Sequence, residues 1–282
     1  MDIDHLRQWI GCQQSESELL TPMLVRKFNA TFDRVSGAAL GDAAPLLIHF
    51  CLAQPIAPGA DLGADGHPAR GGFLPPVPLP RRMWAGGAFR FHADIGIGET
   101  VTRHSTIRDV AMKRGRSGPL CFVTVDHEVT SDGRAVLSER QDIVFRDTGA
   151  PGAAEAARAP DPAPDPAPVG RHSRRIEPTA PLLFRYSAMT FNGHRIHYDR
   201  PYATGVEGYA GLVVHGPMQA TLLCQMAADL RGKAPSSFRF RSLSPIFDDA
   251  DFTVNAESDG EAMKLWTARA GGPVAMQAHA EW

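Results

Sequence analysis

The sequence has few cysteines, and no two of them are close together. Cys12, Cys51, Cys121 and Cys224 are spread over 282 residues, mostly in apolar surroundings, and form no CxxC pair. Structural zinc sites and dithiol redox centres use closely spaced cysteines, so this distribution argues against both classes. We expect the four thiols to be buried and free.

An excess of charge is also missing. Lys and Arg total 29 and Asp and Glu total 31, which gives a net charge of -2, so neither nucleic acid nor a membrane surface is an expected partner. No apolar run approaches the ~18 residues of a membrane-spanning helix. The start, MDIDHLRQWIGCQQ, lacks the basic and then apolar pattern of a signal peptide. We therefore expect a soluble, cytoplasmic protein.

A segment rich in alanine and proline divides the chain. Its composition, over residues 149–172, cannot form a packed core, so we interpret it as a linker. The parts on either side, residues 1–148 and 173–282, are each long enough for a domain.

The two parts share strand patterns. FRF occurs at Phe89 and again at Phe238, each time before a turn and an alternating strand. Each part ends in a predicted hairpin, with turns at Asp132–Gly133 and Gly271–Gly272.

A helix is predicted ahead of the second set of strands. HGPMQATLLCQMAADLRG has apolar residues at helical spacing, with Pro217 in the first turn and Gly232 after the end. The matching helix of the first part is less clear, because the prolines of GGFLPPVPLP prevent it from starting before about Arg81. A helix followed by antiparallel strands, occurring twice, predicts an α+β fold in which two antiparallel sheets each wrap around a central helix.

The stretch FRYSAMTFNGHRIHYDRPYA, followed by GLVVHGPMQ, carries a family resemblance. Together with LPRRMWAGG, GRSGPLCFVTV and QDIVFR, it resembles the MaoC-like hydratases and dehydratases of double-hotdog fold. The nearest branches are the mesaconyl-C4-CoA and itaconyl-CoA hydratases and the type 2 hydroxyacyl-thioester dehydratases. The resemblance covers most of the chain and implies an acyl-CoA substrate. Because sheet edges of hotdog proteins often pair between subunits, it also makes a homodimer an alternative to a monomer.

The general motif of these hydratases is D-x-N-P-[LIV]-H-x-D. His197 and Asp199 match it, whereas Asn192 replaces the first Asp, as in the type 2 branch that the sequence resembles. The segment Gly41–Leu47, GDAAPLL, looks like a degenerate copy with Leu47 in place of the base. The resemblance therefore implies a catalytic second hotdog and a first hotdog that only holds substrate.

Hydration of an enoyl thioester needs a base for water, an acid for the α-carbon and donors for the enolate oxygen. His197 is the expected base, and the amide of Asn192 could hold the water. The N–H of Gly216, at the start of the predicted helix, is the expected oxyanion donor. The role of Asp199 could be structural alone, as a cap of the loop. Gly216 could likewise be an ordinary residue at the start of a helix.

Seven further side chains are candidates for substrate binding. Arg82 and Trp84 could form a wall for an anionic acyl group, with Arg185 as the second candidate for pairing its carboxylate. Tyr186 and His215 could contact substrate or pack in the core. Arg239 and Arg241 alternate on a strand and could bind phosphate or face solvent.

No cofactor is expected apart from the coenzyme A of the substrate. His194 and His197 have the spacing of a metal pair, but no third ligand follows, so we expect no metal.

The favoured function is a hydratase of a short, branched, C4-carboxylated enoyl-CoA, which converts mesaconyl-C4-CoA or itaconyl-CoA to citramalyl-CoA. A 3-hydroxyacyl-thioester dehydratase of fatty-acid synthesis is the alternative, and a hotdog thioesterase is a third class. Asn192 and the degenerate first motif would also fit a non-catalytic acyl-CoA-binding protein.

Overall fold

The two FRF segments form the strands that join the halves. Phe89 pairs with Phe238 across antiparallel strands, and Gly87 pairs with Phe240. The ring of Phe89 is stacked on both phenylalanines, with centroids 6.2 Å and 5.6 Å away. A side chain on Gly87 would meet the Phe240 ring at 2.8 Å, so glycine allows this close approach. The repeated FRF segments thus form the junction between the two halves of the molecule, which we call the seam.

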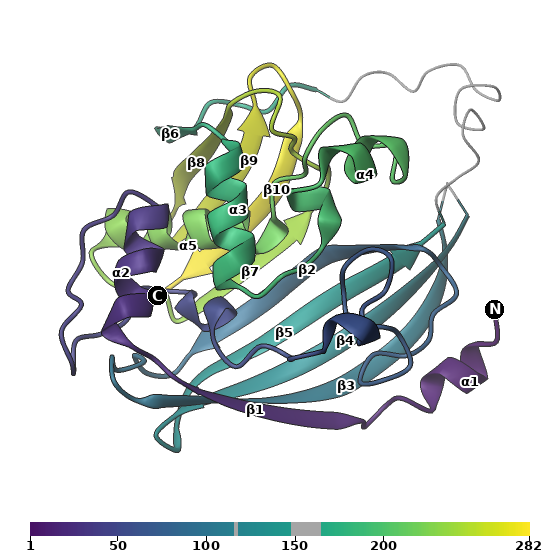
Figure 1. Cartoon of the computed structure of the whole chain (residues 1–282). Coiled ribbons are helices and arrows are strands. Elements are labelled where there is room, and N and C mark those ends of the chain that lie inside the picture. The colour runs from purple at the N-terminus through teal and green to yellow at the C-terminus, as the bar shows by residue number, and fades with distance from the viewer. Residues whose placement is uncertain (116–117, 148–164) are drawn as a thin grey trace.

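The computed structural model describes residues 1–115, 118–147 and 165–282. Its strands form one antiparallel sheet in the order β1-β3-β4-β5-β2-β7-β10-β9-β8-β6 (Figure 1). The α+β class is confirmed. The predicted pair of separate sheets is corrected to one continuous sheet, because β2 and β7 pair with each other and leave no open edge between the halves.

The strands and helices have these bounds. The strands are β1 (Gln13–Leu19), β2 (Arg81–Phe91), β3 (Thr100–Gly115), β4 (Gly118–Ser131), β5 (Arg134–Arg146), β6 (His172–Ile176), β7 (Ser237–Ser242), β8 (Phe252–Asp259), β9 (Ala262–Arg269) and β10 (Val274–Glu281). The helices are α1 (Ile3–Arg7), α2 (Pro22–Thr31), α3 (Ala180–Met189), α4 (Arg200–Gly205) and α5 (Gly216–Arg231), with 3-10 turns η1 (Ile48–Cys51), η2 (Gly59–Asp61) and η3 (Arg195–His197).

The predicted helix and both hairpins are confirmed. Helix α5 ends at Gly232, which has a left-handed conformation with φ 75°. The turn between β4 and β5 is Asp132–Gly133, where both residues have positive φ, as a two-residue hairpin turn requires. The turn between β9 and β10 contains Gly271.

The expected helix near Arg81 is wrong, because that segment is strand β2. Its side chains alternate toward the inner face of the sheet, where they meet the core. The first half has only one turn, η1, in the place that α5 occupies in the second half. Hydrogen bonds identify this correspondence: Ala44 N donates to Ile95 O at 2.9 Å, as Val214 N donates to Ile246 O at 2.8 Å.

The same bonds correct the interpretation of Gly41–Leu47. This segment pairs with the loop after β2, just as residues 211–217 pair with the loop after β7. It is therefore the counterpart of the stretch before α5, and not of the loop that carries His197. The apparent Asp and Pro-Leu match is coincidental.

A single hydrophobic core spans the seam. It contains Phe28 of α2, Phe89 of β2, Leu223 of α5 and Phe238 of β7. Helices α2 and α3 lie side by side between the two halves of the sheet (Figure 1). A second cluster, described below, covers the far end of β3, β4 and β5.

The remaining expectations have mixed outcomes. Cys51, Cys121 and Cys224 are buried as expected, but Cys12 is exposed. Most of the predicted linker, residues 149–164, lies outside the described residues, and its described end contacts the second half through Pro168 O, which accepts from Trp266 Nε1 at 3.0 Å. No helix among the described residues is long and apolar enough to span a bilayer.

Candidate active site

His197 is buried and has a defined tautomer. It ends the short turn η3, and its Nδ1 lies 2.7 Å from the carbonyl oxygen of Val213. A carbonyl can only accept, so Nδ1 carries the proton and Nε2 keeps a lone pair. Burial lowers the pKa of His197 to about 4, so the imidazole is neutral near pH 7. This is the state that a general base needs.

His215 lies against the base. The rings of His197 and His215 are stacked, with centroids 3.7 Å apart and planes 19° apart. His215 is fully buried, and its Nε2 is 2.8 Å from Ser187 Oγ on α3. Tyr186 packs edge-on against the His215 ring and is buried too. His215 therefore packs directly on His197, and Tyr186 packs on His215. Contact of either residue with substrate stays a prediction.

Gly216 follows His215 and begins the 16-residue helix α5. Its N–H donates to no acceptor among the described residues, so it remains available for an oxyanion. A Cβ at this position would lie 3.1 Å from Trp84 Cε3. Glycine thus allows Trp84 to pack on the helix start, close to Gly216 and to the neighbouring His215, which is stacked on His197. The roles expected for these residues remain predictions.

The loop before His197 is held by its own side chains. Asn192 Oδ1 accepts from His194 N at 3.0 Å, which leaves the amide Nδ2 as a donor for water. Asp199 accepts from Tyr202 N at 3.1 Å and from the Arg195 guanidinium at 2.7 Å. The interpretation of Asp199 as a cap is therefore confirmed.

A loop of the first half, which was not predicted to be part of the site, contacts the segment before His197. Asp65 O accepts from Arg195 N at 2.9 Å, and a Cβ on Gly66 would lie only 2.0 Å from Gly193 O. His67 follows, with its ring centroid 4.2 Å from that of His194, which in turn lies 5.4 Å from His197. The only signal was a glycine between two chemically active side chains, in the run ADGHP.

The predicted arginines separate into two groups. Arg82 pairs with Phe145 across the strands, so its side chain lies on the same face as that buried ring. Arg185, Arg239 and Arg241 are exposed. Arg185 is on the side of α3 away from its buried residues, and the two strand arginines lie on the outer face of β7, opposite the buried phenylalanines. The structure does not bring these three to His197.

One group of potential metal ligands lies in the described part of the chain. Nitrogen and oxygen atoms of Asp65, His67 and His194 lie within 4.8 Å of one another. The charge of Arg82 is close enough to lower the pKa of both histidines, and it would repel a cation. The expectation that the reaction needs no metal remains a prediction.

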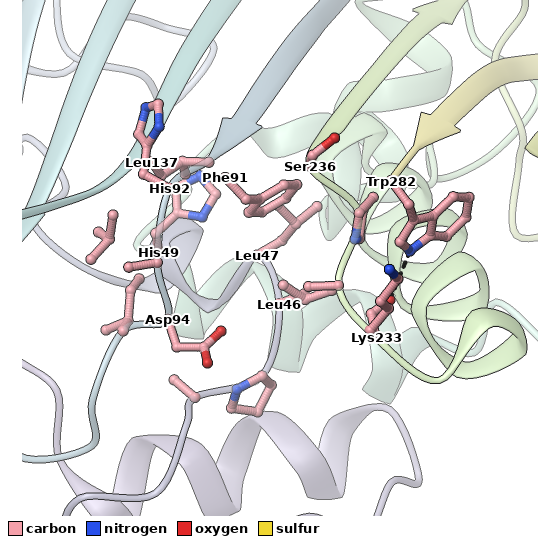
Figure 2. Close-up of a pocket in the computed structure, with 17 residues that line it drawn as sticks. Leu46, Leu47, His49, Phe91, His92, Asp94, Leu137, Lys233, Ser236 and Trp282 are labelled. Atoms are coloured by element: carbon pink, nitrogen blue, oxygen red, sulfur yellow. Dashed lines mark hydrogen bonds between the residues drawn. The ribbon is translucent and has the colours of Figure 1, made fainter. Parts of the chain in front are cut away.

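A cavity of about 330 Å³ lies elsewhere along the seam. Leu46, Phe91 and Asp94 of the first half face Lys233 and Trp282 of the second half across it (Figure 2). It adjoins the segment that corresponds to the start of α5, but there the sequence has Pro45 and Leu46 in place of His215 and Gly216. His49, the imidazole in its lining nearest this segment, already contacts Glu139 Oε2 at 3.2 Å through Nε2. The cavity therefore lacks the helix-start glycine of the His197 site.

The fold is similar to that of several proteins of known structure. A MaoC-like dehydratase from Phytophthora capsici superposes with a TM-score of 0.70, covering 100% of this chain and 98% of that one at 13% identity. HtdX of Mycobacterium tuberculosis gives 0.65, covering 95% and 99% at 15% identity. Another Mycobacterium tuberculosis protein, described as having a double hotdog fold, gives 0.58 at 13% identity over 96% of this chain and 95% of that one. These similarities show the hotdog fold.

Sequence similarity identifies the family. The chain is 43% identical to the mesaconyl-C(4)-CoA hydratase of Chloroflexus aurantiacus over 97% of its own length and 96% of that protein's. It is 25% identical to the mitochondrial hydroxyacyl-thioester dehydratase type 2 of Schizosaccharomyces pombe, over 78% of this chain and 79% of that one. Residues 47–248 match the model of the hydroxyacyl-thioester dehydratase type 2 family. The chain belongs to this family.

Proposed function

We propose that the chain is a hydro-lyase that adds water reversibly to a short, branched enoyl-CoA bearing a free carboxylate, such as mesaconyl-C4-CoA or itaconyl-CoA. The observation that supports the chemistry is the buried, neutral His197 beside the free N–H at the start of α5. The substrate class is suggested by the 43% identical hydratase.

With mesaconyl-C4-CoA, His197 Nε2 takes a proton from water while the water oxygen bonds to the β-carbon. The π electrons move toward the thioester oxygen, where the Gly216 N–H stabilises the developing charge, a contribution worth ~3 to 4 kcal/mol for one such donor. The same imidazole then returns its proton to the α-carbon, which gives citramalyl-CoA. Asn192 is proposed to hold the water through Nδ2, because its Oδ1 already accepts from His194 N.

The family description favours the reverse reaction, dehydration of a 3-hydroxyacyl thioester, as the second candidate. A non-catalytic binding protein is less well supported, since the base keeps the tautomer that catalysis needs.

Purified protein should be mixed separately with crotonyl-CoA, mesaconyl-C4-CoA and itaconyl-CoA. Loss of the conjugated thioester absorbance measures hydration of crotonyl-CoA and mesaconyl-C4-CoA. Mass spectrometry of the product measures hydration of itaconyl-CoA, whose double bond is not conjugated with the thioester. The proposal expects a higher kcat/KM for the carboxylated substrates, with citramalyl-CoA as product. Preference for long uncharged acyl chains would move the assignment to the fatty-acyl dehydratase, and release of free coenzyme A would indicate a thioesterase.

A further inference from the structure

Arg82 has unused hydrogen-bonding capacity. It makes no hydrogen bond or ion pair with another described residue, although its neighbour Arg81 pairs with Glu207. Burial lowers the pKa of Arg82 to about 10, and the charge of Asp65 acts in the opposite direction. A partly buried guanidinium without a fixed partner is costly, and a bound carboxylate would satisfy it.

Asp65 is not the carboxylate partner of Arg82, because both of its carboxylate oxygens contact His67 of the same loop. Oδ1 accepts from His67 N at 3.0 Å, and Oδ2 lies 3.1 Å from His67 Nδ1. This arrangement fixes the tautomer and the direction of the ring, so that Nε2 of His67 points away from Asp65. The two side chains are only 14% and 19% exposed.

His67 is neutral as the pocket stands. Burial and the charge of Arg82 lower its pKa to about 4, while Asp65 acts to raise it. Because the charge of Arg82 acts on His67, the two groups are near each other, so a carboxylate bound at Arg82 would lie beside the His67 ring. The other charged or titratable groups nearby are Arg70, His194 and His197.

The position fits the chemistry of the substrate. In both mesaconyl-C4-CoA and itaconyl-CoA the free carboxylate is attached to the β-carbon, where water adds. Its receptor must therefore lie next to the base, and not at the end of a long acyl pocket. The His67 ring contacts the His194 ring, which contacts the His197 ring, so a carboxylate receptor at His67 would lie close to the base.

We propose that Arg82 and His67 together bind the free carboxylate of the substrate, with Asp65 positioning His67, so that a loop of the first half determines specificity for β-carboxylated acyl groups. This inference rests on the proposed function for its substrate, but it can be tested without turnover. Succinyl-CoA carries a carboxylate on its β-carbon and has no double bond, whereas butyryl-CoA has a methyl group there.

Calorimetry should measure Kd for both thioesters with the full chain. Wild type should bind succinyl-CoA at least ~10-fold more tightly than butyryl-CoA, as expected for a charge-assisted pair in a buried site. Arg82→Met and His67→Gln should each remove most of this preference and leave Kd for butyryl-CoA nearly unchanged. Asp65→Asn should weaken the preference less, because the ring is still present but held less firmly.

Asp61→Asn, in the same loop, and His104→Gln are matched controls, since both side chains are exposed. They should keep the wild-type preference. Equal affinity of wild type for the two thioesters, or an unchanged preference in His67→Gln, would overturn the proposal. Unchanged binding of butyryl-CoA shows that a variant is folded; if His67→Gln fails this check, His67→Asn takes its place.

The two proposals fail separately. If wild type prefers succinyl-CoA but hydrates no carboxylated enoyl-CoA, the proposed receptor is supported and the proposed function is wrong. If wild type hydrates mesaconyl-C4-CoA while His67→Gln still prefers succinyl-CoA, the proposed function is supported and the proposed receptor is wrong.

Discussion

The pKa of His197 provides a direct test of the proposed base. The imidazole is active only when neutral, so kcat/KM should fall as pH drops through the pKa of the free enzyme. Burial lowers that pKa to about 4. At pH 5.5 a histidine with the ordinary pKa would be roughly one-tenth neutral, whereas His197 should be almost entirely neutral.

We therefore expect kcat/KM to be nearly flat from about pH 5.5 to 7.5. The assay is the loss of conjugated thioester absorbance, with circular dichroism at each pH to confirm folding. This check is needed because the unfolded chain binds a proton at His197 near pH 6.5 and the folded chain only near 4. The free energy of unfolding therefore decreases as pH falls from about 6.5 to about 4.

His197→Gln should lower kcat by ~10² to 10⁴ and leave Kd for butyryl-CoA unchanged. His104→Gln is the surface control. An acid limb centred near pH 6.5 in folded wild type would refute the buried neutral state, and retained activity in His197→Gln would remove this residue from the reaction.

Further changes follow from the same geometry. Asn192→Asp should preserve the loop bond to His194 N and move the acid limb of kcat/KM to higher pH, because a carboxylate raises the pKa of a nearby histidine; an unmoved limb would place Asn192 away from the base. Gly216→Ala should lower kcat by at least ~10-fold, because its Cβ would crowd Trp84 at the oxyanion donor; wild-type turnover would refute that assignment. Dialysis against EDTA should leave the hydration rate unchanged. If the rate instead falls and one added metal ion restores it, a metal site at Asp65, His67 and His194 would be supported. Deletion of residues 149–164 should retain activity within a few-fold if they act only as a connector, whereas a loss above ~10-fold would give them a direct role.

Local patterns in the sequence predicted the elements that depend on local physics. Helix α5 followed from apolar spacing, an early proline and a final glycine, and the hairpin at Asp132–Gly133 followed from its turn residues. His197 was found because its motif is contiguous. Helix α3 was not predicted, although Thr179 and Pro181 are ordinary signals for the start of a helix.

Contacts between distant segments could not be predicted in this way. Asp65 and His67 reach the site through backbone contacts to Arg195 and Gly193, which are far away in the sequence. No periodicity marks such a contact. The comparison of Gly41–Leu47 with the hydratase motif failed for a related reason: three matching letters carry less information than a backbone hydrogen-bond pattern.

The two halves differ in a way that connects fold to specificity. In the first half the long helix is reduced to η1, and the far end of β3, β4 and β5 is covered in part by the short helix α1 through Leu6. Segment 73–79 covers it, with Val77 and Leu79 packed among Val123 and Phe145. Burying these side chains stabilises the fold and fixes the chain just after His67, since Arg70 donates to the carbonyls of Val77 and Leu79. The first half, which lacks the helix-start glycine, thus anchors the loop that carries His67 into the site of the second half. On this argument, substitutions in the cover, such as Val77→Ala, should weaken selection of the carboxylated thioester before they affect hydration of crotonyl-CoA.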